Sequence, residues 1–100
     1  MDGRRLETLI ARIKSGSDEA AWELVEEYGP HLHAVLSRRL NPSMRRTFDT
    51  NDFMQAAWAS LFRILPRITL VKDPKKFVAL LATIACRRMN NEYRRRHLVD

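Results

Sequence analysis

The chain has 100 residues, of which 45% are apolar and 30% are charged, and it contains one cysteine, Cys86. This length suits one domain with a modest core, and a single cysteine excludes an internal disulfide. The net charge is +6 and uneven: residues 1–40 hold six Lys/Arg and seven Asp/Glu, whereas residues 41–100 hold twelve and five. Such one-sided basicity favours a polyanionic partner.

The chain carries no sign of export or of membrane insertion. Its first residues lack the apolar segment of a signal peptide. The longest uncharged apolar run, Phe77 to Cys86, is about half the roughly 20 residues that span a bilayer. We expect a soluble cytoplasmic protein that contacts no membrane.

The first two predicted helices are separated by Ser15-Gly16-Ser17. The first covers about 4–14, where apolar residues recur at helical spacing. The second begins at Ser17 or Asp18, either of which is a good N-cap, and runs to about Leu40. Gly29-Pro30 interrupts it, but the apolar residues on the two sides of the break share one face. We therefore expect one helix, kinked at Gly29-Pro30.

The second half of the chain contains two further predicted helices. A turn at Asn41-Pro42-Ser43 precedes a third helix that begins at Asp49 or Thr50 and ends before Pro66. A loop follows from 66 to 72, and Asp73-Pro74 is a strong start signal for a fourth helix that reaches about His97. No segment alternates for long enough to form a strand. The sequence predicts an all-α fold, a small bundle of about four helices.

The third predicted helix has two different faces. One arc is apolar and predicted to face the core; it contains Phe53, Met54, Ala57, Trp58, Leu61, Ile64 and Leu65. The opposite arc contains Asp52, Gln55, Ala56, Ala59 and Arg63. This flat, weakly charged strip could accept another helix, although alanine is also simply a good helix former.

The fourth predicted helix begins apolar and ends basic. Phe77, Leu80, Leu81, Ile84 and Ala85 are expected to pack on the other helices, and the same stripe continues through Arg88, Asn91 and Arg95. Polar groups cannot follow apolar ones into a core without a large desolvation cost. The second half of this helix is therefore expected to pass beyond the bundle or to lie against something charged. Cations near a helix C-terminus suit its dipole, which accounts for some of the arginines.

Two stretches, DFMQAAW (52–58) and FVALLATIACRRMNNEYRRR (77–96), resemble region 2 of sigma-70 family factors, in particular the extracytoplasmic-function (ECF) group. In that family a D-x-x-Q-E motif is followed, after a short loop, by F-x-x-W-L-x-x-I-A-x-N and a basic tail. The earlier GSDEAAWELVEEYGPHLHAVLSRRL is similar to the family's leading helix. The resemblance covers about Ser15 to Arg96 and implies a transcription initiation domain.

The resemblance also implies partners and site residues. Asp52, Gln55, Ala56 and Ala59 fall where sigma factors meet the clamp helices of the RNA polymerase beta-prime subunit. The loop and the last helix fall where the family captures a flipped base and melts the promoter −10 element, on its non-template strand. The DNA-binding candidates there are Arg67, Thr69, Lys72, Lys75, Lys76, Arg87, Arg88, Asn90, Asn91, Arg94 and Arg95. An anti-sigma factor is a further candidate partner.

Three residues depart from the family pattern: Ala56 replaces a glutamate, Leu80 a tryptophan and Arg87 an asparagine. We expect residues 1–100 to form one domain, with its region 2-like core at about 15–97 and no region 4 for the −35 element. Two alternatives remain open. One is a small helical DNA- or RNA-binding module unrelated to polymerase, and the other is a polymerase or anti-sigma interaction domain that does not read DNA.

No catalytic or metal-binding constellation is predicted, so we expect a non-enzyme without cofactor. His31 and His33 point to different sides of a helix, and no carboxylate pair or second cysteine completes a metal site. Cys86 lies in a packed helix and is interpreted as structural. The glutamates at 19, 23, 26 and 27 are interpreted as a solvated face.

Overall fold

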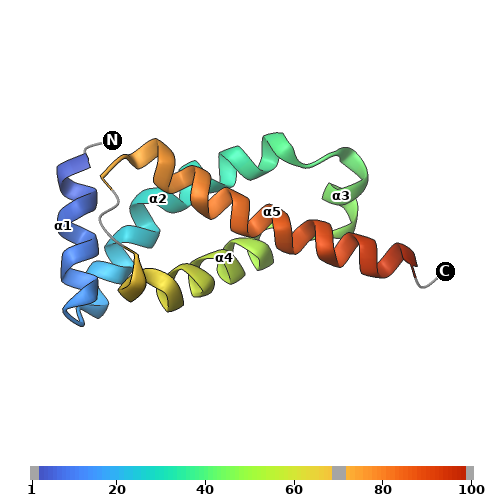
Figure 1. The fold of residues 1–100 in the computed structure, drawn as a ribbon. Helices are drawn as coiled ribbons and strands as arrows, with labels where there is room; N and C mark the ends of the chain where they lie inside the picture. The colour runs from blue at the N-terminus through green and yellow to red at the C-terminus, as the bar shows by residue number, and fades with distance from the viewer. Residues whose placement is uncertain (1–2, 69–71, 99–100) are drawn as a thin grey trace.

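The computed structural model describes residues 3–68 and 72–98, which contain helices and no strand. The elements are α1 Gly3–Lys14, α2 Asp18–Arg39, α3 Pro42–Thr47, α4 Thr50–Ile64, the short 3-10 helix η1 Leu65–Arg67 and α5 Pro74–Leu98. In Figure 1, α5 crosses α2 and α4, α1 lies beside the start of α5, and the last turns of α5 extend past the other helices. The predicted all-α bundle is confirmed.

The junction between α1 and α2 follows the predicted stop and start signals. Gly16 has a positive φ of 100°, which L side chains rarely adopt. One residue later, the Ser17 hydroxyl accepts a hydrogen bond of 3.1 Å from the Ala20 N–H and caps α2. Local backbone chemistry is therefore sufficient to end one helix here and begin the next.

Helix α2 continues through Pro30 as a single element, as predicted. Gly29 helps because it has no Cβ to collide with the proline ring, a collision that disfavours helical backbone before most prolines. Nothing outside the helix lies within 4 Å of where a Gly29 Cβ would be. The buried residues on the two sides of the proline share one face, among them Leu24, Tyr28, Leu32 and Leu36.

The predicted turn at 41–43 is wrong, because these residues begin the short helix α3. The Asn41 side chain accepts a hydrogen bond of 2.8 Å from the Met44 N–H, and Pro42 occupies the first helical turn. Asparagine followed by proline is compatible with a helix start as well as with a turn. Met44, inside this helix, and Phe48, its C-cap, are both buried.

Helix α4 begins as predicted, with the Asp49 carboxylate accepting a hydrogen bond of 2.9 Å from the Asn51 N–H. Ala57, Trp58 and Leu61 are buried on its core face, as expected. Ile64 was also assigned to the core, but its side chain is 37% exposed. The core line steps from Leu61 directly to Leu65, which belongs to η1, and this leaves Ile64 at the edge of the bundle.

Helix α5 starts where predicted, with the Asp73 carboxylate accepting a hydrogen bond of 2.9 Å from the Lys75 N–H. Its apolar line takes a different course from the predicted one. After Phe77, Leu81 and Ala85, the buried line continues through Met89, which is 1% exposed. Leu80 and Ile84 are only half-buried.

The row of residues that becomes polar therefore lies beside the buried row and is not the buried row itself. Arg88, Asn91 and Arg95 follow Leu80 and Ile84 along that polar row, and all three are exposed. The four-residue steps from Phe77 to Met89 keep the apolar side against the bundle, because residues four apart lie on the same helix face. The helix thus does not need to bury any of its arginines.

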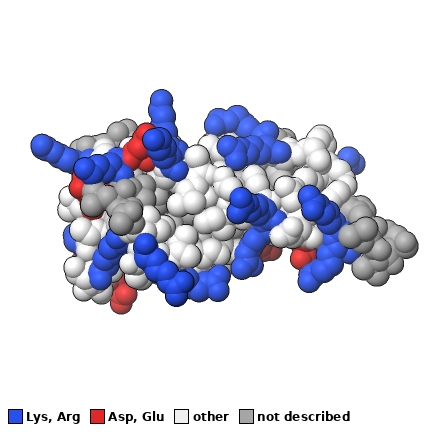
Figure 2. Space-filling view, viewed as in Figure 1, with Lys and Arg blue, Asp and Glu red and all other residues white. Residues whose placement is uncertain are grey.

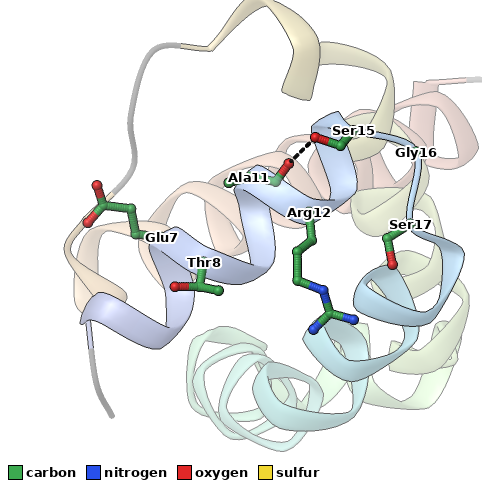
Figure 3. Close-up of a pocket in the computed structure, with 7 residues that line it drawn as sticks. All are labelled: Glu7, Thr8, Ala11, Arg12, Ser15, Gly16 and Ser17. Carbon is green, nitrogen blue, oxygen red and sulfur yellow. Dashed lines mark hydrogen bonds between the residues drawn. The ribbon is translucent and has the colours of Figure 1, made fainter.

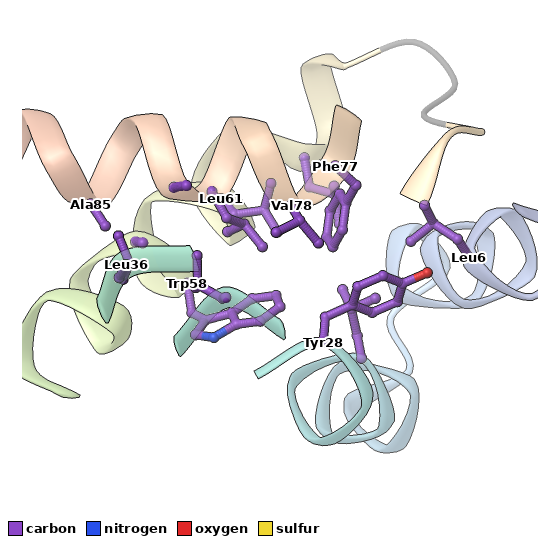
Figure 4. Packing of buried hydrophobic residues seen from close by; sticks show 14 of the residues in the cluster. Leu6, Tyr28, Leu36, Trp58, Leu61, Phe77, Val78 and Ala85 are labelled. Carbon is purple, nitrogen blue, oxygen red and sulfur yellow. The ribbon is translucent and has the colours of Figure 1, made fainter. Parts of the chain in front are cut away.

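Aromatic side chains from α2, α4 and α5 meet in the middle of the core (Figure 4). The Tyr28 ring lies edge-on to the Phe77 ring with a centroid separation of 5.1 Å. The Trp58 ring is 6.2 Å from Phe77 and stacks on Phe62 at 6.0 Å. Such pairs add roughly 0.5–1.5 kcal/mol each beyond the area that they bury. Phe77 therefore joins α5 to both of the helices beneath it.

Ion pairs attach α1 to the side of α2. Arg5 donates to the Glu27 carboxylate at 2.9 Å, and Arg12 donates to Glu23 at 3.3 Å. The interpretation of Glu23 and Glu27 as part of a solvated face is therefore wrong, since both are half-buried against α1. Water screens partly exposed pairs of this kind, so they contribute little to stability. The main contact of α1 is therefore its apolar face, which includes Leu6 and Leu9.

Replacing Gly16 tests the junction between α1 and α2. Gly16→Ala should lower the free energy of unfolding by about 1–2 kcal/mol, because an L residue at positive φ is strained. Gly16→Asn should lose less, since asparagine tolerates positive φ better. Urea unfolding followed by circular dichroism measures both, and an alanine variant as stable as the parent would contradict this account of the turn.

Candidate functional site

The side of α4 away from its buried residues carries the four predicted polymerase-binding residues, with the exposed Arg63 of the predicted arc at its end. Asp52, Gln55 and Ala59 are exposed and Ala56 is half-buried. Their spacing of three, four and seven residues places them on one side of the helix. Within the described residues, Asp52 makes no ion pair and Gln55 no side-chain hydrogen bond. A second helix could approach this face closely, because two of its four side chains are methyl groups.

The outward face of α5 is a basic stripe, which we define as Lys76, Arg87, Asn90 and Arg94. All four are exposed and lie on the side of α5 opposite the buried line. At 1.5 Å per residue the stripe is about 27 Å long. Figure 2 shows Lys and Arg spread along the length of the molecule with few acids between them. Exposed cations with few acids between them give this surface a positive potential.

A groove of about 400 Å³ opens beside the basic stripe. It is lined by Phe53 of α4 and by Arg88, Asn91, Glu92 and Arg95 of α5. The sequence interpretation assigned Phe53 to the core, but its side chain is half-buried and reaches this groove as well. An aromatic ring, an amide and a guanidinium together can stack on and hydrogen-bond a planar polar ligand.

Glu92 holds two of the terminal arginines. Both of its carboxylate oxygens accept hydrogen bonds of 2.7 Å from Arg95, and Arg96 lies 3.5 Å away. The hydrogen bond from Arg95 lowers the pKa of Glu92 below its ordinary value, with the charge of Arg96 as a smaller cause. The Arg96 guanidinium also lies 4.9 Å from the centre of the Phe48 ring. Arg95 is therefore partly neutralised, whereas Arg87, Arg88 and Arg94 make no ion pair within residues 3–68 and 72–98.

The predicted DNA-binding residues near the loop form a second group. Arg67, Lys72, Lys75 and Lys76 are exposed at the start of α5 and at the end of η1. Thr69 lies outside the described residues. This group lies at or before the start of α5, whereas the candidate arginines Arg87, Arg88, Arg94 and Arg95 lie in its second half. The structure therefore does not gather the candidates into one compact patch. They are connected only along the basic stripe.

Helix α1 contacts the chain on both sides of residues 69–71, at Ile68 and Lys72, which the sequence interpretation missed. The Lys14 ammonium donates a hydrogen bond of 2.6 Å to the Ile68 carbonyl. At the other end of α1, a Cβ on Gly3 would lie 2.5 Å from the Lys72 carbonyl oxygen, so only glycine fits this close approach. No short-range pattern could have revealed these contacts, because 54 residues separate Lys14 from Ile68.

A basic groove between α2 and α5 was also missed. It has a volume of about 370 Å³, and Arg38, Arg39 and Lys75 surround an apolar floor that includes Val35 and Val78. The basic last turn of α2 was a visible signal in the sequence. Its juxtaposition with Lys75 became apparent only in the folded chain.

A hollow of about 660 Å³ lies along α1 and the turn to α2 (Figure 3). Two of its polar side chains have partners, since Ser15 donates to the Ala11 carbonyl and Arg12 to Glu23. Glu7 and Thr8 also line it. Among the described residues no group of three or more His, Cys, Asp or Glu side chains could hold a metal ion. None of the helices described is both long and apolar enough to cross a membrane.

The ion pair between Glu92 and Arg95 can be tested by measuring the pKa of Glu92. Its lowered pKa means that the contact with Arg95 stabilises the fold at neutral pH and is lost as the pH falls through that lowered value. Arg95→Ala should raise the Glu92 pKa toward the ordinary carboxyl value. Titration of the Glu92 carboxyl signal by NMR measures this, with Arg87→Ala as the control that should leave it unchanged. The same pKa in parent and Arg95→Ala would refute the pairing.

Comparison with known families gives one match. The family described as sigma-70 region 2 matches residues 24–98, which include most of α2 and all of α3, α4 and α5. No curated protein and no solved structure matches the chain. The matched segment contains both the exposed face of α4 and the whole basic stripe, while α1 and residues 18–23 of α2 precede it.

Proposed function

Because the chain belongs to the sigma-70 region 2 family, we propose that it is the region 2 domain of an ECF-type initiation factor. Region 2 of sigma-70 factors is a non-enzymatic domain that binds RNA polymerase and recognises the promoter −10 element. In the proposed arrangement, α4 docks on the clamp helices of the beta-prime subunit. The basic stripe of α5 then holds the non-template strand of the −10 element.

One observation carries this proposal: two neighbouring helices present two chemically different surfaces. The α4 face of Asp52, Gln55, Ala56 and Ala59 is small and nearly uncharged, which suits a protein helix. The α5 stripe is basic, which suits phosphate. Since α4 packs directly on α5, a partner on one helix would lie close to a ligand on the other. That proximity is what a factor needs to bring DNA to polymerase.

The polymerase contact depends on close approach at Ala59. A methyl side chain lets a partner helix lie near the α4 backbone, while Asp52 and Gln55 provide hydrogen-bonding groups at its edge. Ala56, which replaces the family's glutamate, is half-buried and adds no charge. The contact is therefore expected to rely on shape and on two polar groups more than on charge.

The DNA contact uses the basic stripe and the adjoining groove differently. Arginines of the stripe can bind phosphate with paired donors. In the groove, Asn91 can offer a donor and an acceptor to one base edge, and the half-buried Phe53 ring provides an apolar wall. A base can enter this groove only if it is unstacked. A single strand is therefore expected to bind better than the same sequence as duplex, since the duplex keeps its bases stacked.

The α4 assignment is tested by retention of core RNA polymerase on the immobilised domain. Ala59→Arg should weaken binding about ten-fold or more, equivalent to about 1.4 kcal/mol, because a long cation prevents close approach. Gln55→Ala should weaken it less. Ala11→Arg, an exposed alanine on α1, is the matched control. Binding of Ala59→Arg at the parental level would exclude this face, and no retention of the parent would favour a nucleic-acid module unrelated to polymerase.

The α5 assignment is tested with labelled single strands of a −10-like sequence and their single-base variants, over a range of salt. Arg94→Ala should weaken all sequences alike and flatten the log–log salt slope by about 0.7. Asn91→Ala should cost about 1–3 kcal/mol at one base and little elsewhere. Arg12→Ala, on α1 and paired with Glu23, is the control. An unchanged salt slope in Arg94→Ala, or equal affinity of the parent for duplex, would contradict the proposed DNA contact.

A further inference from the structure

Trp22 is an exposed tryptophan near the start of α2. Its side chain is 70% exposed, and among the described residues the other exposed large hydrophobic is Ile64, at 37%. A single exposed apolar residue needs no explanation. Trp22 differs because it stands at the rim of a groove, and because tryptophan is the residue type most enriched among side chains that dominate protein interfaces.

The groove beside Trp22 has an apolar floor. Ala21, Trp22 and Val25 of α2 and Phe62 of α4 line a hollow of about 330 Å³. A second hollow of about 320 Å³ shares Ala21 and Phe62 with the first and continues toward Leu65 and Pro66. The two hollows adjoin at these shared residues, and we call them together the Trp22 groove. Its length and apolar floor suit the apolar side of a helix.

Acidic side chains surround Trp22 on α2. Asp18 and Glu19 lie one turn before it and Glu26 one turn after it, and all three are exposed. Asp18 itself lines both hollows. Unlike Glu23 and Glu27, none of the three makes an ion pair within the part of the chain that the structure describes. In a chain with a net charge of +6, this acidic rim repels phosphate and attracts a cationic partner.

We propose that the Trp22 groove binds a basic amphipathic helix of a partner protein. An apolar side chain of that helix packs against Trp22 and Phe62, while its Lys or Arg residues face Asp18, Glu19 and Glu26. The acidic rim disfavours nucleic acid as the occupant. Lys14 also lines the second hollow, but its ammonium already donates to the Ile68 carbonyl. Most of the groove's α2 residues precede the segment that matches the sigma-70 region 2 family, so this docking site is an addition to the proposed polymerase and DNA contacts.

The experiment uses a synthetic Leu/Lys peptide of about 18 residues, long enough for five helical turns. A Leu/Glu peptide and a scrambled Leu/Lys peptide serve as comparisons. Trp58 is 6% exposed and Trp22 is 70% exposed, so a blue shift of fluorescence on binding reports mainly on Trp22. We expect the shift with the amphipathic Leu/Lys peptide, and equal binding of either comparison peptide would overturn the proposal.

Two variants locate the binding. Trp22→Ala should weaken the Leu/Lys peptide about ten-fold or more, measured by calorimetry, whereas Ile64→Ala should not, because Ile64 lines neither hollow. The charge variant Asp18→Asn with Glu26→Gln should weaken binding and flatten its salt dependence. These positions are exposed, so circular dichroism should show unchanged helicity. Parental affinity in Trp22→Ala, or in the charge variant at low salt, would overturn the proposal.

Two further measurements exclude other occupants. Sedimentation should show that the parent chain is a monomer. A dimer that Trp22→Ala abolishes would mean that a second copy of the chain occupies the groove, and would overturn the proposal. Trp22→Ala should also retain core RNA polymerase as the parent does. If Trp22→Ala lost polymerase as severely as Ala59→Arg does, the groove would be part of the polymerase contact, and the proposal of a separate partner would be overturned. If Ala59→Arg retained polymerase like the parent, only the assignment of the α4 face would be contradicted.

Discussion

The contact of Phe77 with Tyr28 and Trp58 joins the three long helices of the bundle. It fixes which side of α5 faces inward near its start, and the buried line through Leu81, Ala85 and Met89 follows from that choice. Because a helix is rigid over its length, orienting one turn orients all the others. The outward direction of Arg87, Asn90 and Arg94 is thus a consequence of aromatic packing about three to five turns away.

The far end of α5 remains attached to the bundle by a smaller cluster. The Tyr93 ring lies edge-on to the ring of Phe48, the residue after α3, and Arg96 lies over the same ring. Met89 and Met44 are buried members of the same core cluster. This arrangement lets α5 be half core and half basic surface without burying a charge. Glu92 moderates the basic end by holding Arg95, which leaves Arg87, Arg88 and Arg94 as the more available cations.

Helix α1 has two roles that distinguish it from the rest of the chain. Its apolar face closes one end of the core, and its two ends contact the chain at Ile68 and Lys72, on either side of the loop that precedes α5. The basic stripe begins at Lys76, four residues after Lys72, so α1 contacts the chain close to the start of the proposed nucleic-acid surface. The last residues of α1, Ile13 and Lys14, and the turn at Gly16 also line one end of the Trp22 groove, which is the surface proposed for a protein partner.

The sequence by itself determined where most helices begin and end. The side chains of Ser17, Asp49 and Asp73 accept hydrogen bonds from backbone groups two or three residues away. Because this effect is local, the start of each helix could be predicted from the neighbouring residues alone. Helical periodicity likewise predicted the exposed face of α4. Tertiary structure decided the rest: that the core line of α5 runs through Met89 and not Arg88, that Ile64 is exposed, that Glu23 and Glu27 pair with α1, and that Phe53 shares a groove with Asn91. A periodic pattern defines a stripe only to within about one residue, and which edge of it is buried depends on where the neighbouring helices lie.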